Sequence, residues 1–207
     1  MAQNKRRPRV RRARRRGRIY KAIGIAVLVL ALIGLGTAVL MDRLAEQSLQ
    51  RYPMEYTDLI RSCAAEEGLE PAYVAAVILA ESSYNPQAVS SVNAQGLMQI
   101  MPETGAWIAG KFDESYVDGC LFDPETNIRY GCWYLGYLLR RYDGDKTCST
   151  AAYHSGQGTV DGWLKDPQYS TDGRTLNIIG GPRANTYVGR VLEYYEKYKQ
   201  LYEKLEA

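Results

Sequence analysis

The 207-residue sequence predicts a mostly α-helical domain preceded by a single N-terminal transmembrane helix. Apolar residues recur at helical spacing in several segments after residue 55, and no stretch keeps the apolar–polar alternation that is typical of strands. Residues 22–41 contain no charged side chain. At about 1.5 Å per residue, such a helix covers a hydrocarbon core of roughly 30 Å.

The N-terminal part has a charge pattern that predicts its orientation in a membrane. Residues 1–18 contain ten Lys or Arg and no acid, so the positive-inside rule predicts a basic cytoplasmic tail. We expect an anchor at residues 19–41, a juxtamembrane stalk at residues 42–54 and an extracellular domain at residues 55–207. A cleavable signal peptide is the alternative, but its apolar core would usually span only about 7–15 residues.

The basic tail also raises the question of its partner. An arginine-rich tail can bind nucleic acid, but this one abuts the apolar span with no acid between them. Contact with anionic membrane lipid is therefore the favoured role, and no nucleic-acid partner is expected.

The domain after the span is acidic and holds all of the cysteines. Residues 42–207 contain fifteen basic and 23 acidic side chains, a net charge of −8. An even number of cysteines outside the cell permits two disulfides, in any of three connectivities, with free buried thiols as the alternative. No C-x-x-C pair occurs and there is one histidine, so neither a metal site nor a cofactor is expected. The cysteines are Cys63, Cys120, Cys132 and Cys148.

The first two helices of the domain are predicted from their ends. Residues 55–67 have helical periodicity and stop at Gly68, a residue type favoured just beyond a helix. Pro71 suits the first position of the next helix, which Asn85 and Pro86 close.

The remaining elements follow in the same way. Asp123 suits the cap of a long helix because Pro124 fits the first helical position after it. The last helix carries tyrosines at helical spacing, which indicates core packing. In order, we expect a buried helical turn at residues 96–101 and helices at residues 102–108, 123–144, 146–154, 159–164 and 183–205.

One ionisable residue occupies a position that packing alone would not give it. Glu81 follows Val77 and Ile78 by four and three residues, so it shares the apolar face of its helix. A carboxylate facing inward is costly to bury unless it is paired or protonated. We therefore take Glu81 as a candidate catalytic acid.

Because motifs for other kinds of catalysis are absent, acid catalysis by a carboxyl group is the chemistry that we expect. The sequence has no phosphate-binding loop, dinucleotide fingerprint, H-E-x-x-H helix or G-x-S-x-G elbow. Glycoside cleavage fits a carboxylic acid held protonated by apolar surroundings. The usual scheme needs a second carboxylate, yet residues 82–102 contain no acid.

Four motifs, taken in order along the chain, carry a family resemblance. Glu81-Ser82-Ser83-Tyr84-Asn85-Pro86 and Gly96-Leu97-Met98-Gln99-Ile100-Met101-Pro102, followed by Ala151-Ala152-Tyr153 and Tyr187-Val188-Gly189-Arg190-Val191, resemble the lytic transglycosylase domain related to goose-type lysozyme. The resemblance covers about residues 55–200 and implies a lysozyme-like helical fold. Residues 55–207 would form the catalytic domain, with peptidoglycan glycan strands as the partner.

The resemblance implies cleavage of the β-1,4 bond between N-acetylmuramic acid and N-acetylglucosamine. A single glutamate, here Glu81, would act first as acid and then as base, while the muramic 6-hydroxyl attacks its own anomeric carbon to leave a 1,6-anhydro end. Ordinary hydrolysis by the same glutamate and a noncatalytic wall-binding module are the alternatives.

The same resemblance assigns roles around Glu81. Ser90 and Gln99 would hydrogen-bond the sugar, and Gly96, Leu97 and Met98 would line the cleft. The remaining substrate contacts would come from Tyr153, His154 and Tyr187, and Tyr84 is expected in the cleft as well.

The sequence departs from the family pattern at two places. The third motif usually reads Ala-Tyr-Asn-Ala-Gly, but His154 stands where the asparagine is usual. Ahead of the Tyr-Val motif, Arg183-Ala184 replaces a frequent Glu-Thr pair. Both changes concern residues expected to contact the sugar or support the cleft wall, and they leave Glu81 intact.

Overall fold

The computed structural model describes residues 7–206 and divides into two units between Arg51 and Tyr52. The first unit is one helix, α1 (Arg7–Arg51), and residues 1–6 of the predicted basic tail lie outside the described residues. Within α1, Ile23–Met41 is long and apolar enough to cross a membrane by length and composition. The helix continues through most of the predicted stalk.

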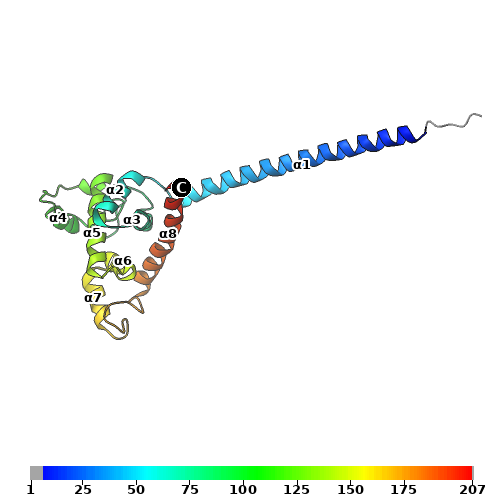
Figure 1. The fold of residues 1–207 in the computed structure, drawn as a ribbon. Helices are drawn as coiled ribbons and strands as arrows, with labels where there is room; N and C mark the ends of the chain where they lie inside the picture. The colour runs from blue at the N-terminus through cyan, green and yellow to red at the C-terminus, as the bar shows by residue number, and fades with distance from the viewer. Residues whose placement is uncertain (1–6, 207) are drawn as a thin grey trace, which may run out of the picture. The chain divides into compact units, whose positions relative to one another are not determined.

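The second unit is helical, as predicted, and begins at Tyr52, just before the expected boundary at residue 55. In the part of the chain that the structure describes, the only β pairing consists of isolated bridges from Gln95 to Val89 and to Ile100. The elements of this unit (Figure 1) are α2 (Thr57–Glu67), α3 (Pro71–Ser82), α4 (Pro102–Ala109), η1 (Cys120–Phe122), α5 (Pro124–Arg141), α6 (Lys146–Ser155), α7 (Gln157–Lys165) and α8 (Pro182–Glu206).

Helix α3 is the most deeply buried of these helices. Pro71 occupies its first turn, and the chain leaves it through Ser83 in the left-handed region with φ 53°. Residues 72–78 are all buried, so the helix is enclosed on every side for two turns. Its main partner is α8. The predicted aromatic core of α8 is confirmed, since Tyr187, Tyr195, Tyr198 and Tyr202 are buried.

Of the other helices, α2 packs directly on α3 and α6 packs directly on α8. Helix α5 packs against α2, α4 and α6, and α6 packs in turn against α8 (Figure 1). The predicted cap of α5 is confirmed, since the Asp123 carboxylate accepts a hydrogen bond from the Thr126 N–H at 2.9 Å. Asp145, which was not predicted as a cap, caps α6 in the same way. The packing of α6 on α8 brings His154, near the end of α6, against Tyr187 of α8.

The segment between α3 and α4 is a folded loop, and the prediction of a helical turn at residues 96–101 is wrong. Gln95 and Ile100 exchange backbone hydrogen bonds of 2.9 and 3.0 Å, which close the intervening residues into a tight turn. Gly96 and Gln99 both have positive φ values, 77° and 49°, and a right-handed helical turn cannot accommodate them.

Asn127 of α5 holds this loop in place. Its carboxamide oxygen accepts from the Met98 N–H at 2.7 Å, and its Nδ2 donates to the carbonyl oxygens of Gln95 at 2.9 Å and Leu121 at 2.7 Å. A Cβ atom at Gly96 would collide with this carboxamide and with the Leu121 carbonyl oxygen. Glycine is therefore required here both for its φ value and for the close approach of α5.

All four cysteines have free thiols in the structure. Cys63 of α2 and Cys132 of α5 lie side by side, where a hydrogen bond between the thiols lowers the pKa of Cys63 and raises that of Cys132. Cys148 is buried and its Sγ donates to the Arg174 carbonyl oxygen at 3.7 Å. Disulfide formation stays a prediction, with Cys63 and Cys132 as the pair in contact.

Replacing Asn127 by alanine should destabilise the domain by about 3 kcal/mol or more, because three buried backbone groups would lose their partner. The measurement is chemical denaturation of the full chain in detergent micelles. Asn185→Ala, an exposed position on α8, is the matched control and should change stability by less than about 0.5 kcal/mol. Equal stability of the two variants would contradict the anchoring role of Asn127.

Candidate active site

Glu81 lies in the last turn of α3, half-buried, and is held from a distant part of the chain. The Tyr187 hydroxyl of α8 donates a hydrogen bond of 2.5 Å to Glu81 Oε1, across 106 residues of sequence. Burial raises the pKa of Glu81 to about 7, although this hydrogen bond and the charge of Arg190 act in the opposite direction. A carboxyl group with that pKa exchanges its proton near neutral pH.

Two side chains lie against the ring of Tyr187. The His154 imidazole at the end of α6 stacks on its ring, with centroids 4.4 Å apart and planes inclined by 16°. The Arg190 guanidinium lies 5.9 Å from the centroid of the same ring, one helical turn further along α8. Partial burial and the charge of Arg190 lower the pKa of His154.

Tyr153 connects the site to the tight turn at residues 96–99, which we call the glycine turn. Its hydroxyl donates to the Met98 carbonyl oxygen at 2.8 Å, so α6 is fastened to the turn that Asn127 fastens to α5. Burial, and next the charge of Glu81, raises the pKa of Tyr153 well above its ordinary value. The hydroxyl therefore keeps its proton and remains a donor.

The glycine turn presents mainly backbone to this region. Leu97 and Met98 have fully buried side chains that belong to the core, so contacts with a ligand would have to come from their backbone. The Cβ that Gly131 lacks would overlap the Met98 side chain, which shows how closely α5 packs on the turn.

Ser90 and Gln99 stabilise the loop through hydrogen bonds within the chain. Ser90 Oγ accepts from the Ala94 N–H at 3.0 Å, and Gln99 Nε2 donates to the carbonyl oxygens of Ala88 and Gly96 at 3.1 and 3.0 Å. The Ser90 hydroxyl proton and the Gln99 carboxamide oxygen have no bond to the chain among the described residues, so both are free to bind a ligand.

The structure corrects the sequence prediction for one residue and adds two residues that the prediction missed. Tyr84 does not line the site: it is 5% exposed, and its ring packs 6.5 Å from that of Tyr198. The left-handed backbone at Ser83 and Tyr84 turns the side chain into the core. Conversely, Arg190 and Asn127 were not predicted; the spacing of Arg190, three residues after Tyr187, was the available signal.

Two cavities adjoin this cluster on the α8 side. One, of about 410 Å3, is lined by Tyr187 together with His154, Pro182, Arg183, Thr186 and Arg190. The other, of about 350 Å3, shares His154 and Arg183 and extends along residues 180–184.

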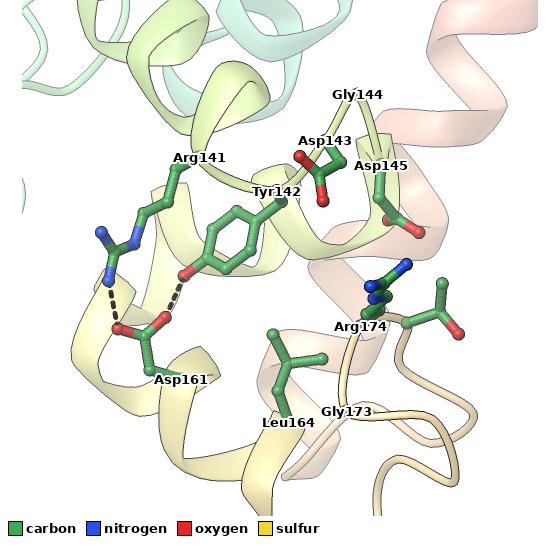
Figure 2. Close-up of a pocket in the computed structure, with 10 residues that line it drawn as sticks. Arg141, Tyr142, Asp143, Gly144, Asp145, Asp161, Leu164, Gly173 and Arg174 are labelled. Carbon is green, nitrogen blue, oxygen red and sulfur yellow. Dashed lines mark hydrogen bonds and ion pairs between the residues drawn. The ribbon is translucent and has the colours of Figure 1, made fainter.

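A larger cavity of about 690 Å3 lies at the far end of α6 and contains none of the predicted site residues. Figure 2 shows the Arg141 guanidinium and the Tyr142 hydroxyl directed at the carboxylate of Asp161, with ion-pair and hydrogen-bond distances of 2.5 and 3.1 Å. Because these groups satisfy one another, we place the chemistry at Glu81. Among the described residues, no group of three or more His, Cys, Asp or Glu side chains is arranged to hold a metal ion.

Known proteins resemble this chain over most of its length. The soluble lytic murein transglycosylase of Escherichia coli strain K12 is 33% identical over 165 residues, which cover 78% of this chain and 26% of that protein. The membrane-bound lytic murein transglycosylase C of Edwardsiella ictaluri is 34% identical over 154 residues, covering 66% of this chain and 40% of that one. The chain therefore spans between about a quarter and two fifths of the length of these relatives.

Solved structures give the same result. The 70 kDa soluble lytic transglycosylase of Escherichia coli superposes with a TM-score of 0.68 at 31% identity, covering 80% of this chain and 27% of that chain. An inactive Glu-to-Gln mutant of the lytic transglycosylase Slt from Pseudomonas aeruginosa superposes with a TM-score of 0.66 at 30% identity, covering 73% and 25%. The transglycosylase SLT domain family matches residues 58–175, more than half of the sequence, and the chain belongs to this family.

Proposed function

We propose that this chain is a peptidoglycan lytic transglycosylase that cleaves the β-1,4 bond between N-acetylmuramic acid and N-acetylglucosamine, with Glu81 as its acid and base. The observation that carries the proposal is the half-buried Glu81 carboxyl, with its pKa raised to about 7 and Tyr187 bonded to it. Such a group can hold a proton in the free enzyme and give it to a leaving oxygen.

The reaction proceeds in two steps. Protonated Glu81 gives its proton to the glycosidic oxygen as the bond to the muramic C1 breaks, and the acetamido oxygen of the substrate stabilises C1. The Glu81 carboxylate then takes the proton of the 6-hydroxyl, whose oxygen bonds to C1 and closes the anhydro ring. Glu81 ends protonated, as it began.

A substrate nucleophile is favoured because, among the described residues, no acidic side chain acts on the Glu81 carboxyl. In the described part of the chain, the charged group that acts on its pKa is Arg190, and no second acid does so. A hydrolase of the two-carboxylate type would place a second acid within about 5–10 Å. Hydrolysis, in which Glu81 activates water, is the outcome that product analysis would reveal.

Substrate contacts follow from the groups left free around Glu81. We propose that Ser90 and Gln99 use their free hydroxyl proton and carboxamide oxygen on the sugar. Gly96, Leu97 and Met98 would offer backbone groups, while Tyr153 positions the turn. Tyr187 orients the Glu81 carboxyl, and His154 packs behind it.

We further propose that residues 19–41 anchor the enzyme as a single-pass protein of the cell membrane, with the basic tail in the cytoplasm against anionic lipid and the domain outside. The apolar stretch Ile23–Met41 of α1 and the similarity to membrane-bound lytic murein transglycosylases support this placement. Tethering would keep the enzyme within reach of the wall.

Glu81→Gln should reduce the release of soluble fragments from purified sacculi by about 100- to 10,000-fold, because an amide cannot donate the proton. Mass analysis of the fragments made by the unaltered enzyme should find 1,6-anhydromuramic ends. Glu193→Gln, an exposed acid on α8, is the control and should keep full activity. Reducing muramic ends would show hydrolysis, and equal, negligible release by the unaltered chain and Glu81→Gln would show a noncatalytic module.

The rate should fall as the pH rises above about 7, because the general acid Glu81 then loses its proton. Tyr187→Phe removes the hydrogen bond that lowers the Glu81 pKa, so this alkaline decline should move to higher pH. The maximal rate should fall by about tenfold as the carboxyl loses its orientation. Pre-steady-state or initial rates across the pH range provide the measurement.

Tyr194→Phe, on the same helix, is the matched control, since its ring packs against that of Tyr52 and Tyr194 is not among the groups that shift the pKa of Glu81. Its pH profile should coincide with that of the unaltered enzyme. A Tyr187→Phe profile with the same alkaline midpoint as this control would contradict the coupling between Tyr187 and Glu81.

A further inference from the structure

Two of the four thiols meet inside the core of the domain. Cys63 lies on α2 and Cys132 on α5, two helices that pack directly on each other. Both side chains belong to the buried core, and a hydrogen bond joins their thiols. A disulfide between them would close the loop from residue 63 to residue 132, which contains Glu81 and the glycine turn.

The other two cysteines are placed differently. Cys148 is buried on α6, where its Sγ donates to the Arg174 carbonyl oxygen at 3.7 Å. Cys120 begins η1 and is the one cysteine of the four that is only half-buried. Accessibility alone would therefore direct an oxidant to Cys120, whereas contact between thiols favours Cys63 and Cys132.

The two thiols in contact differ in reactivity. The hydrogen bond to Cys132 lowers the pKa of Cys63, although burial acts in the opposite direction. The same hydrogen bond, together with burial, raises the pKa of Cys132. Cys63 is 6% exposed and Cys132 is 0% exposed. Because the thiolate is the form that attacks a disulfide, Cys63 is the thiol that reacts first with an oxidant.

The position of Cys132 on α5 connects this pair to the glycine turn. The preceding residue, Gly131, packs so closely on Met98 that a Cβ atom there would overlap the Met98 side chain. One turn earlier on α5, the Asn127 carboxamide oxygen accepts from the Met98 N–H at 2.7 Å. Fixing α5 to α2 at Cys132 therefore fixes the stretch of helix that holds the turn.

We propose that Cys63 and Cys132 form an oxidation site, at which a disulfide joins α2 to α5 and locks the helix that holds the glycine turn. The oxidant is a small disulfide or a disulfide-bearing oxidoreductase on the side of the membrane where the domain lies. The inference goes beyond the proposed function, because it holds whichever reaction Glu81 performs.

The oxidation is an exchange of disulfides in two steps. The Cys63 Sγ attacks one sulfur of the oxidant, forms a mixed disulfide and displaces the other sulfur as a thiol. The Cys132 thiol then loses its proton, and its Sγ attacks the Cys63 Sγ and displaces the second thiol of the oxidant. The chain gives up two electrons and two protons, and the disulfide of the oxidant is reduced to two thiols.

The test compares the reduced and oxidised forms of the unaltered full-length chain in detergent, with oxidised glutathione as the probe. We expect peptide mass spectrometry to find Cys63 linked to Cys132, with the loss of two hydrogen atoms. The thermal midpoint of the oxidised form should be higher by about 10 °C, because the bond closes a long loop in the unfolded chain. The reduced chain is the reference, so this result does not depend on the folding of a variant.

Two variants separate this bond from oxidation elsewhere. Cys63→Ala should gain no thermal stability from oxidised glutathione. Cys120→Ala is the matched control and should gain as much as the unaltered chain. Oxidation that yields no bond between Cys63 and Cys132, or a bond that leaves the thermal midpoint unchanged, would overturn the inference.

Hydrogen exchange tests the connection to the glycine turn. The Met98 amide, which donates to Asn127, should exchange at least about tenfold more slowly in the oxidised chain. Amides in the last turn of α8 (residues 203–206) are the control and should exchange equally in both forms. Equal exchange of the Met98 amide in the two forms would overturn the locking of the turn.

Activity separates this inference from the proposed reaction. At a temperature between the two thermal midpoints, only the oxidised chain should release fragments from sacculi. If neither form releases fragments at room temperature, the proposed reaction fails, and the thermal and exchange measurements still decide the disulfide. If both forms release fragments and lose this activity at the same temperature, the reaction stands and the disulfide does not.

Discussion

The hydrogen bond from the Tyr187 hydroxyl to Glu81 joins the two helices on which the domain is built. Helix α3 is enclosed for two turns and ends in a carboxyl group that water reaches only in part, and α8 packs along it and supplies the tyrosine. The burial that stabilises the α3–α8 pair also raises the pKa of Glu81. Packing and the chemistry of the site therefore have a common physical origin, and a loosening of the pair would alter both.

A second constraint positions the other wall of the site. The buried carboxamide of Asn127 fixes the glycine turn to α5, while Tyr153 fixes the same turn to α6. These bonds hold a loop without regular structure against α5 and α6. Buried polar groups of this kind are stabilising only when all partners are present, so the turn keeps a single geometry.

The sequence was sufficient for the helical class and the core stripe of α8, because both depend on local periodicity. The choice of Glu81 as the catalytic acid rests on its apolar helix face and on a motif, and it stays a proposal. It was insufficient where distant contacts decide the structure. The turn at Gly96 was wrongly predicted to be helical. Its backbone angles depend on contacts with Asn127, thirty-one residues later, which the local sequence does not show. Tyr84 was expected in the cleft, but the left-handed backbone turns it inward. Arg190 acquires its role only through the packing of α8 on α3.

The account depends most directly on the protonation of Glu81, which can be measured without substrate. In a chain labelled at its glutamate carboxyl carbons, nuclear magnetic resonance follows each titration, and the signal missing from Glu81→Gln identifies Glu81. We predict a midpoint near 7 for this carboxyl in the folded domain. A midpoint near 4.5, the ordinary value for glutamate, would contradict the conclusion that burial prepares Glu81 as a proton donor.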